Sequence, residues 1–172
     1  MNPEPLLTAD EIADCIERLA KDIAPRVEDD TVAVALLTGA LWFAADLTRA
    51  LARMGRRLSF DALWLGSYGE GRVSSGRCEV RAGLQRPVSG RKVLLMDDVF
   101  DSGLSLSEGG RLLYEAGARE VLYAVFASKP WPSARPLEPD FVGWHAPPRF
   151  LVGYGMDVAG DWRGLPYIGA LD

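Results

Sequence analysis

Acidic and small residues follow directly on an apolar run near the middle of the chain. Residues 93–96 are Val-Leu-Leu-Met, Asp97 and Asp98 come next, and residues 101–103 are Asp-Ser-Gly. The apolar run predicts a strand buried on both faces of a parallel sheet, and such sheets bind ligands at the carboxyl ends of their strands. The Asp-Ser-Gly turn would let backbone N–H groups converge where a helix begins near Leu104, an arrangement that binds phosphate. A phosphorylated sugar fits both features, with its hydroxyls on the carboxylates, its phosphate in the turn and Mg²⁺ between them.

Two other interpretations of this segment start from the acids alone. An ordinary strand followed by a solvated acidic loop and a serine-capped helix would contain the same residue types. An acid pair of the response-regulator kind would account for Asp97 and Asp98, but it gives no reason for the turn at 101–103. The order of the whole segment therefore favours a phosphate site.

Strands and helices are predicted to alternate along the chain. A first amphipathic helix begins at a capping box formed by Thr8 and Glu11, ends near Pro25 and covers the sheet. Prolines and glycines interrupt the pattern after residue 129, and we expect 150–172 to be an irregular cap over the ligand edge. The alternation predicts an α/β fold with a parallel sheet. The other expected helices cover 41–54 and 104–116, and the expected strands cover 31–37, 58–68, 77–84, 93–96, 120–128 and 141–144.

Length and composition favour one globular domain. The chain has 172 residues, of which 48% are hydrophobic and 25% charged, and its net charge of −5 argues against a general nucleic-acid binder, which needs a basic face. No stretch approaches 18 apolar residues, and the first residues lack the basic start and apolar core of a signal peptide, so we expect a cytoplasmic protein that binds no membrane.

Cysteine and histidine are too sparse for several kinds of site. Cys15 and Cys78 lack the spacing of a metal site or disulfide framework, and we expect both to be packing residues. His145 is the only histidine, which argues against a hydrolase triad and a zinc site.

The segment 93–105 resembles the phosphoribosyl-pyrophosphate (PRPP) signature of type I phosphoribosyltransferases. That signature consists of four apolar residues, two acids, two apolar residues, then Asp-Thr/Ser-Gly and a later Thr/Ser. Further blocks resemble bacterial hypoxanthine-guanine phosphoribosyltransferases and appear in the same order along the chain. These blocks are residues 36–47, 67–69, 74–76, 129–130, 139–144, 148–157 and 163–169.

The resemblance implies a fold and an activity. The fold would be the type I phosphoribosyltransferase fold, a single domain over 1–172 with a central, mostly parallel sheet flanked by helices and a small hood formed mainly by residues from about 129 to 172. The activity would be Mg²⁺-dependent purine salvage. The enzyme would transfer the 5-phosphoribosyl group of PRPP to hypoxanthine or guanine, giving IMP or GMP and pyrophosphate.

The resemblance also assigns roles to individual residues. Asp101 would be the general base at the purine N7, and Asp157 would join the two preceding acids, Asp97 and Asp98, as metal ligands. The segment 69–76 would close as a lid over the reacting sugar. The PRPP and ribose-phosphate group comprises Asp97, Asp98, Asp101, Ser102, Gly103, Leu104 and Ser105; the pyrophosphate group comprises Thr38, Gly39, Ser67, Tyr68 and Arg163; the purine group comprises Lys129, Phe150 and Leu151.

Three positions depart from the family pattern. The first acid of the signature is usually glutamate, and Asp97 is one methylene shorter. The pyrophosphate turn commonly has lysine where this chain has Thr38, which bears on pyrophosphate affinity. Val158 stands where an aromatic residue often follows the last acid.

Two other functions are alternatives to purine salvage. A phosphoribosyltransferase-like regulator that senses nucleotides and binds RNA would need a basic face, which the acidic charge balance does not favour. A transferase for xanthine or a pyrimidine is another alternative; Lys129 and Phe150 favour purines, and the preference at the purine 2-position stays open. The apolar residues 41–43 favour a homodimer or homotetramer, with PRPP and 6-oxopurines as the small-molecule partners.

Overall fold

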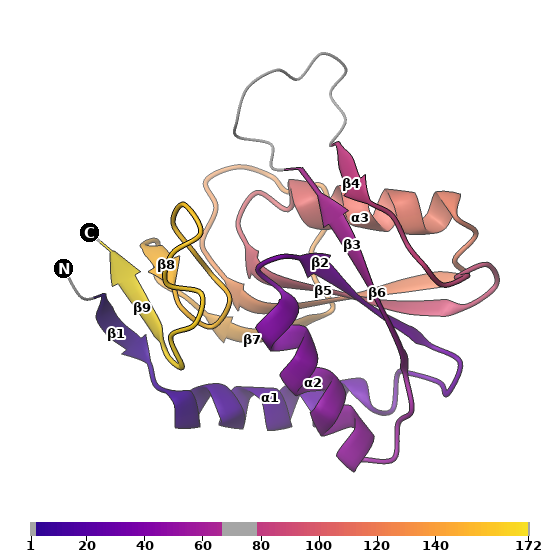
Figure 1. Cartoon of the computed structure of the whole chain (residues 1–172), viewed down its shortest axis with the longest axis horizontal. Helices are drawn as coiled ribbons and strands as arrows, with labels where there is room; N and C mark the ends of the chain where they lie inside the picture. The colour runs from indigo at the N-terminus through magenta and orange to yellow at the C-terminus, as the bar shows by residue number, and fades with distance from the viewer. Residues whose placement is uncertain (1–2, 67–78, 172) are drawn as a thin grey trace.

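The protein is a mixed α/β molecule in which one central sheet carries most of the core (Figure 1). The structure is a computed structural model that describes residues 3–66 and 79–171. Its strands are β1 (Glu4–Leu7), β2 (Val32–Leu37), β3 (Ser59–Leu65), β4 (Val80–Ala82), β5 (Lys92–Phe100), β6 (Glu120–Ser128), β7 (Phe141–His145), β8 (Phe150–Val152) and β9 (Ile168–Leu171). Its helices are α1 (Ala9–Ile23), α2 (Leu41–Arg53) and α3 (Leu104–Glu115).

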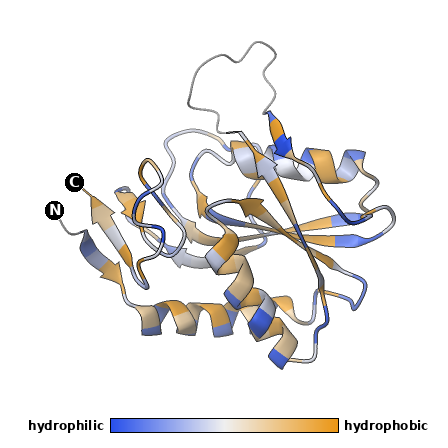
Figure 2. Ribbon diagram, viewed as in Figure 1, coloured by the Kyte–Doolittle hydropathy of each residue, from blue (hydrophilic) through white to orange (hydrophobic). Residues whose placement is uncertain are grey.

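The central sheet has the order β4-β3-β2-β5-β6-β7 over the described residues. All neighbours pair in parallel except β4, which is antiparallel to β3 at one edge. Strands β2, β5 and β6 lie inside the sheet, and each contains an uninterrupted apolar and buried run, as expected for strands covered on both faces (Figure 2 shows the hydropathy). These runs are residues 32–36, 93–96 and 124–127. The predicted parallel sheet is therefore confirmed.

The helices cover opposite faces of this sheet. Helix α2 packs on β2 and β5, and α1 packs on α2 and β7, whereas α3 packs on the other face against β5, β6 and β3 (Figure 1). The capping box predicted for the first helix is present, because Thr8 N donates to Glu11 Oε2 over 2.8 Å and Glu11 N donates to Thr8 Oγ1 over 3.3 Å. The apolar stripe of α1 faces inward, with Ile12, Ile16 and Ile23 buried. Within the described residues, no helix is long and apolar enough to span a membrane.

A small antiparallel sheet of order β1-β9-β8 forms the hood. The strands that form the hood differ from those expected in two ways. Strand β1 comes from the N-terminal segment, and β7, which lies within 129–172, belongs to the central sheet beside β6. Residues 150–171 were expected to be irregular, yet they contain β8 and β9. These strands are stabilised by pairing with residues far away in the chain, as in Glu4 opposite Ala170, so short windows of sequence do not reveal them.

Candidate functional site

The predicted site residues gather where the parallel strands end. Leu37 is the last residue of β2 and leads into Thr38 and Gly39; Lys129 follows the last residue of β6. Strand β5 runs to Phe100, four residues beyond the predicted end, so Asp97 and Asp98 lie inside the strand rather than after it. The register skips Asp98, because Asp97 pairs with Val125 and Val99 with Ala127. Both acids therefore lie at the ligand-binding edge of the sheet.

Two adjoining cavities open at this edge. The first has a volume of about 260 Å³ and is lined by Asp97, Asp98, Asp157, Arg163 and Gly39 among others. The second has a volume of about 220 Å³ and is lined by residues 99–106 together with Asp97. They share Asp97, Val99 and Ser105 as a common wall. The predicted phosphate and metal residues are thus brought together in one continuous region.

The second cavity lies at the N-terminus of α3. Gly103 begins the helix with φ of 79°, and a Cβ there would lie 2.9 Å from the Phe100 ring, so the turn requires glycine. Ser102 Oγ accepts a hydrogen bond from Leu104 N over 3.4 Å, and no acid lies in the first turn of the helix. The free N–H groups and positive dipole end of this helix can hold an anion.

The two adjacent acids are held against the turn that follows β2. Asp97 Oδ1 accepts from Asp98 N over 3.0 Å, and Asp98 Oδ1 accepts from Val99 N over 2.9 Å. Burial raises the pKa of Asp97 well above its usual range, and the neighbouring Asp98 raises it further; burial also raises the pKa of Asp98. A Cβ on Gly39 would lie 2.0 Å from Asp98 Oδ2, so any larger residue there would displace this carboxylate. Ionising both carboxylates destabilises the free protein. Hydroxyl groups of a ligand or a bound cation would stabilise the ionised pair.

Asp101 and Lys129 form an ion pair beside the α3 turn. Lys129 Nζ lies 3.1 Å from Asp101 Oδ1 and donates to Oδ2 over 3.3 Å. Among the described residues Oδ1 is buried without a hydrogen bond, because its approach to Lys129 lacks hydrogen-bond geometry. Lys129 N also donates to Phe100 O over 3.0 Å, which fixes the lysine to the end of β5. The pair places a carboxylate whose side chain is 41% exposed next to a cationic donor.

Arg163 and Asp157 pair with each other in the first cavity. Arg163 Nη2 lies 2.8 Å from Asp157 Oδ1, and Arg163 Nη1 donates to the Gly155 carbonyl. Gly160 N donates to Asp157 Oδ2 over 2.6 Å. The arginine expected to hold pyrophosphate and the acid expected to hold metal therefore occupy one place, where each neutralises the other.

Three carboxylates line the cavity that would hold a metal, namely Asp97, Asp98 and Asp157. Within residues 3–66 and 79–171, no three acidic, cysteine or histidine side chains form a ready-made metal cage. Mg²⁺ is usually held by one or two carboxylates, with waters and substrate phosphates completing its shell. The donor set is therefore consistent with Mg²⁺ arriving with a phosphorylated substrate.

The residues predicted for the purine are less closely gathered. Phe150 is 52% exposed on β8, Leu151 beside it is buried, and neither lines the two cavities described above. Lys129 lines a third cavity of about 380 Å³. Ser67, Tyr68 and the predicted lid at 69–76 lie outside the described residues.

Arg135 was not singled out from the sequence, although it contacts two of the predicted residues. Its side chain is 12% exposed, and it donates to the backbone carbonyls of Asp101 and Lys129. The loop that carries it has no periodicity, so no sequence pattern indicated this contact.

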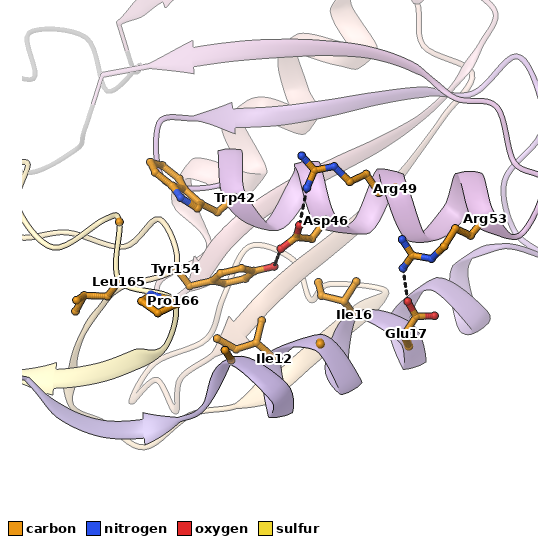
Figure 3. A pocket seen from close by; sticks show the side chains of 13 residues that line it. Ile12, Ile16, Glu17, Trp42, Asp46, Arg49, Arg53, Tyr154, Leu165 and Pro166 are labelled. Carbon is orange, nitrogen blue, oxygen red and sulfur yellow. Dashed lines mark hydrogen bonds and ion pairs between the residues drawn. The ribbon is translucent and has the colours of Figure 1, made fainter.

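The largest of the cavities described lies elsewhere, between α1, α2 and the hood, with a volume of about 470 Å³ (Figure 3). Its floor is apolar, and none of the predicted site residues lines it. Tyr154 Oη donates to Asp46 Oδ2 over 2.9 Å, and Arg49 Nη1 donates to Asp46 Oδ1 over 3.0 Å. Burial and Asp46 raise the pKa of Tyr154, so it remains a neutral donor. Glu17 pairs with Arg53 at the far end.

Comparisons with known proteins agree with this geometry. Residues 4–159 match the family described as phosphoribosyl transferase domain. The chain is 35% identical to hypoxanthine-guanine phosphoribosyltransferase of Bacillus subtilis over 167 residues, covering 96% of this chain and 91% of the relative. It is 35% identical to the Aquifex aeolicus protein of the same name over 165 residues, covering 95% and 91%.

A solved structure of Trypanosoma cruzi hypoxanthine phosphoribosyl transferase superposes with a TM-score of 0.89 at 28% identity, covering 98% of this chain and 91% of that one. The match extends over the central sheet, the loops at its edge and the hood, so the likeness is not confined to one motif. The chain belongs to the phosphoribosyltransferase domain family, among the hypoxanthine-guanine phosphoribosyltransferases.

Proposed function

We propose that the protein transfers the 5-phosphoribosyl group of PRPP to hypoxanthine or guanine. The observation that carries this proposal is the Asp101–Lys129 pair beside the α3 turn. A 6-oxopurine presents N7 and O6 next to each other on one edge. A carboxylate that takes the N7 proton and an ammonium that donates to O6 match that edge, whereas adenine would present an amino group to the ammonium.

The ribose phosphate is assigned to the turn at the start of α3. Backbone N–H groups of residues 102–105 and the hydroxyls of Ser102 and Ser105 supply donors, and the helix dipole favours negative charge. Asp97 and Asp98 line the adjoining cavity and would accept hydrogen bonds from the ribose hydroxyls.

Pyrophosphate and metal are assigned to the cavity lined by Gly39, Arg163 and the acids. Arg163 is already oriented by Asp157 and by the Gly155 carbonyl, and its guanidinium suits a phosphate. Thr38 supplies a hydroxyl where relatives would be expected to supply a lysine, so this chain has one positive charge fewer at the turn. Asp97, Asp98 and Asp157 would hold Mg²⁺, which neutralises the leaving pyrophosphate when bound.

The reaction then requires one proton transfer and one bond exchange. The purine N9 forms a bond to C1 of the ribose as the C1–O bond to pyrophosphate breaks, and the N7 proton passes to Asp101. The Asp101 side chain is 41% exposed, so its carboxylate is accessible to the base and would take this proton. Lys129 stabilises O6 as the electron distribution of the base changes.

An ultraviolet assay with PRPP, Mg²⁺ and each of five bases tests this assignment. We expect turnover with hypoxanthine and guanine, and much less with xanthine, adenine and uracil. Turnover mainly with xanthine would change the base preference and keep the reaction, whereas turnover only with uracil would refute the purine site. No turnover with any base would refute phosphoribosyl transfer.

We further propose that two copies of the chain form a dimer. Leu41 and Trp64 are 40% and 39% exposed, and Phe60 is 38% exposed. Along β3, Phe60 and Trp64 alternate with buried residues on the face that packs against α3. Phe60 and Trp64 therefore point to the opposite face of the sheet, where α2 packs mainly on β2 and β5. Exposed apolar residues grouped on one face favour association.

The cytoplasmic location also stays a prediction from the sequence.

Light scattering after gel filtration tests the dimer. We expect the mass of two chains for the unaltered protein and of one chain for Phe60→Glu, whereas Trp131→Glu, which alters an exposed residue in the loop after β6, should remain a dimer. A monomeric unaltered protein would refute the proposed association.

A further inference from the structure

Arg135, in the loop between β6 and β7, contacts two of the predicted site residues. Arg135 Nε donates to the Asp101 carbonyl over 2.8 Å, and Arg135 Nη2 donates to the Lys129 carbonyl. Its guanidinium carbon lies 4.3 Å from the centre of the Phe100 ring, and Nη1 lies 3.5 Å from Glu138 Oε2. The side chain is thus fixed by contacts on its edge and on its flat face.

The two carbonyls belong to the two residues whose side chains form the Asp101–Lys129 pair. Asp101 lies one residue beyond β5 and Lys129 one residue beyond β6. A guanidinium is planar and holds its donors in a fixed fork, so two carbonyls bound to one fork keep a fixed separation. Arg135 therefore adds a side-chain link between the ends of β5 and β6, next to the last backbone bond from Lys129 N to Phe100 O.

Filling space does not require this guanidinium. The apolar stem of a methionine would cover part of the Phe100 ring, without the cost of removing a charged group from water. The guanidinium instead donates hydrogen bonds to two carbonyls, those of Asp101 and Lys129. These are the two residues proposed to face the purine edge.

We propose that Arg135 is a positioning residue that sets the spacing between the Asp101 carboxylate and the Lys129 ammonium to match N7 and O6 of a 6-oxopurine. This inference rests on the proposed function. It assigns Arg135 no contact with substrate, so its effect must pass through the geometry of the other two residues.

Arg135→Met tests this role, with Arg26→Met as a matched control. Arg26 also lies over a phenylalanine ring, 5.7 Å from the centre of Phe141, and pairs with Asp140, but it is distant in the fold from the Asp101–Lys129 pair. We expect Arg135→Met to lower kcat/KM for hypoxanthine by about tenfold to hundredfold, the scale of a misplacement of about 1 Å. PRPP binding measured by calorimetry should be unchanged, and Arg26→Met should keep full activity.

Chemical rescue separates positioning from folding. Millimolar guanidinium chloride, far below unfolding concentrations, should restore part of the lost turnover in Arg135→Met by occupying the vacated fork, and should leave Arg26→Met unchanged. Arg135→Lys provides a second variant if the first fails to fold, because lysine retains the stem and charge but cannot hold both carbonyls in a fixed geometry. It should also lose turnover with hypoxanthine.

The outcomes distinguish this inference from the proposed function. Full turnover in both Arg135 variants, with an active unaltered enzyme, would overturn the positioning role alone. A loss shared equally by PRPP binding and purine turnover, without rescue, would show a general structural role and would also overturn it. An unaltered protein without turnover would overturn the proposed function and this inference together.

Discussion

The edge of the central sheet and the larger cavity beside α1 differ in how their charges are compensated. In the larger cavity Asp46 is bound by both Tyr154 and Arg49, and Glu17 pairs with Arg53 (Figure 3). At the sheet edge two acids stand side by side, and burial raises the pKa of both. The larger cavity is nearly twice the volume of the one lined by the acids.

Volume alone would select a region that none of the predicted site residues lines. A group of charges that already satisfies itself gains little from a ligand, because new contacts must replace existing ones. Like charges held side by side, such as Asp97 and Asp98, are stabilised by a ligand that brings hydroxyls, a cation or a proton. The comparison therefore predicts opposite effects of similar substitutions in the two regions.

Asp101→Asn should give the largest effect, and it acts at the sheet edge. The amide cannot accept the N7 proton, so we expect kcat to fall by about 10²- to 10⁴-fold while PRPP still binds. Turnover by the ultraviolet assay and PRPP binding by calorimetry measure the two parts.

Asp46→Asn is the matched control in the larger cavity, because it makes the same chemical change in an acid that has two partners. Its turnover should be unchanged. Equal turnover in Asp101→Asn and the unaltered enzyme would exclude the proton role, and a large loss in Asp46→Asn would remove the distinction between the two regions.

Lys129→Met should give the next largest effect. A hydrogen bond from a charged donor contributes about 1.5–3 kcal/mol, so KM for hypoxanthine should rise by about one to two orders of magnitude. Discrimination against adenine should weaken as well, because the ammonium that disfavours an amino group is gone. Lys21→Met, an exposed change in the last turn of α1, should not alter either quantity. An unchanged preference between the two bases in Lys129→Met would show that another group recognises O6.

Much of the fold could be predicted because the central strands and the first helix have strong local patterns. The apolar runs that became β2, β5 and β6 predicted buried parallel strands, and Thr8 with Glu11 predicted the start of α1. The hood could not be predicted in the same way. Its strands are three or four residues long, and β1 pairs with β9 at the opposite end of the chain.

The site, like the fold, combines features that are local in sequence with contacts between distant segments. The turn at 101–103 is continuous in sequence, and its structure follows from the need for glycine at Gly103. The contacts of Arg135 with Asp101 and of Arg163 with Gly155 depend on how separate segments meet. The purine role of Phe150 stays a prediction from the family resemblance, because its ring is exposed and lines neither of the two cavities at the sheet edge.

Tyr154→Phe removes one bond from the larger cavity and should lower stability without lowering turnover. The Asp46 oxygen at 2.9 Å loses its donor, and leaving a partly buried acceptor unpaired costs about 1–3 kcal/mol. The melting temperature should therefore fall by several degrees, as followed by circular dichroism. Tyr123→Phe is the control, because it makes the same change at a partly buried tyrosine that does not line this cavity. An unaltered melting temperature in Tyr154→Phe would mean that the Asp46 network does not stabilise the fold.

Asp97→Asn should change stability in the opposite direction, because the raised pKa of Asp97 means that its ionised form destabilises the folded chain. The folded carboxyl keeps its proton to a higher pH than the unfolded one, so the free energy of unfolding falls as pH rises from about 4 through the folded pKa. The amide removes this loss while retaining an acceptor for Asp98 N. At neutral pH the variant should melt about 2–4 °C higher than the unaltered protein, the equivalent of about 1 kcal/mol, and the difference should vanish toward pH 3. Asp46→Asn should lower stability at the same pH, because the amide keeps only one of the two acceptor oxygens that Tyr154 and Arg49 use. A shared sign in the two variants would show that the sheet edge is no more strained than the larger cavity.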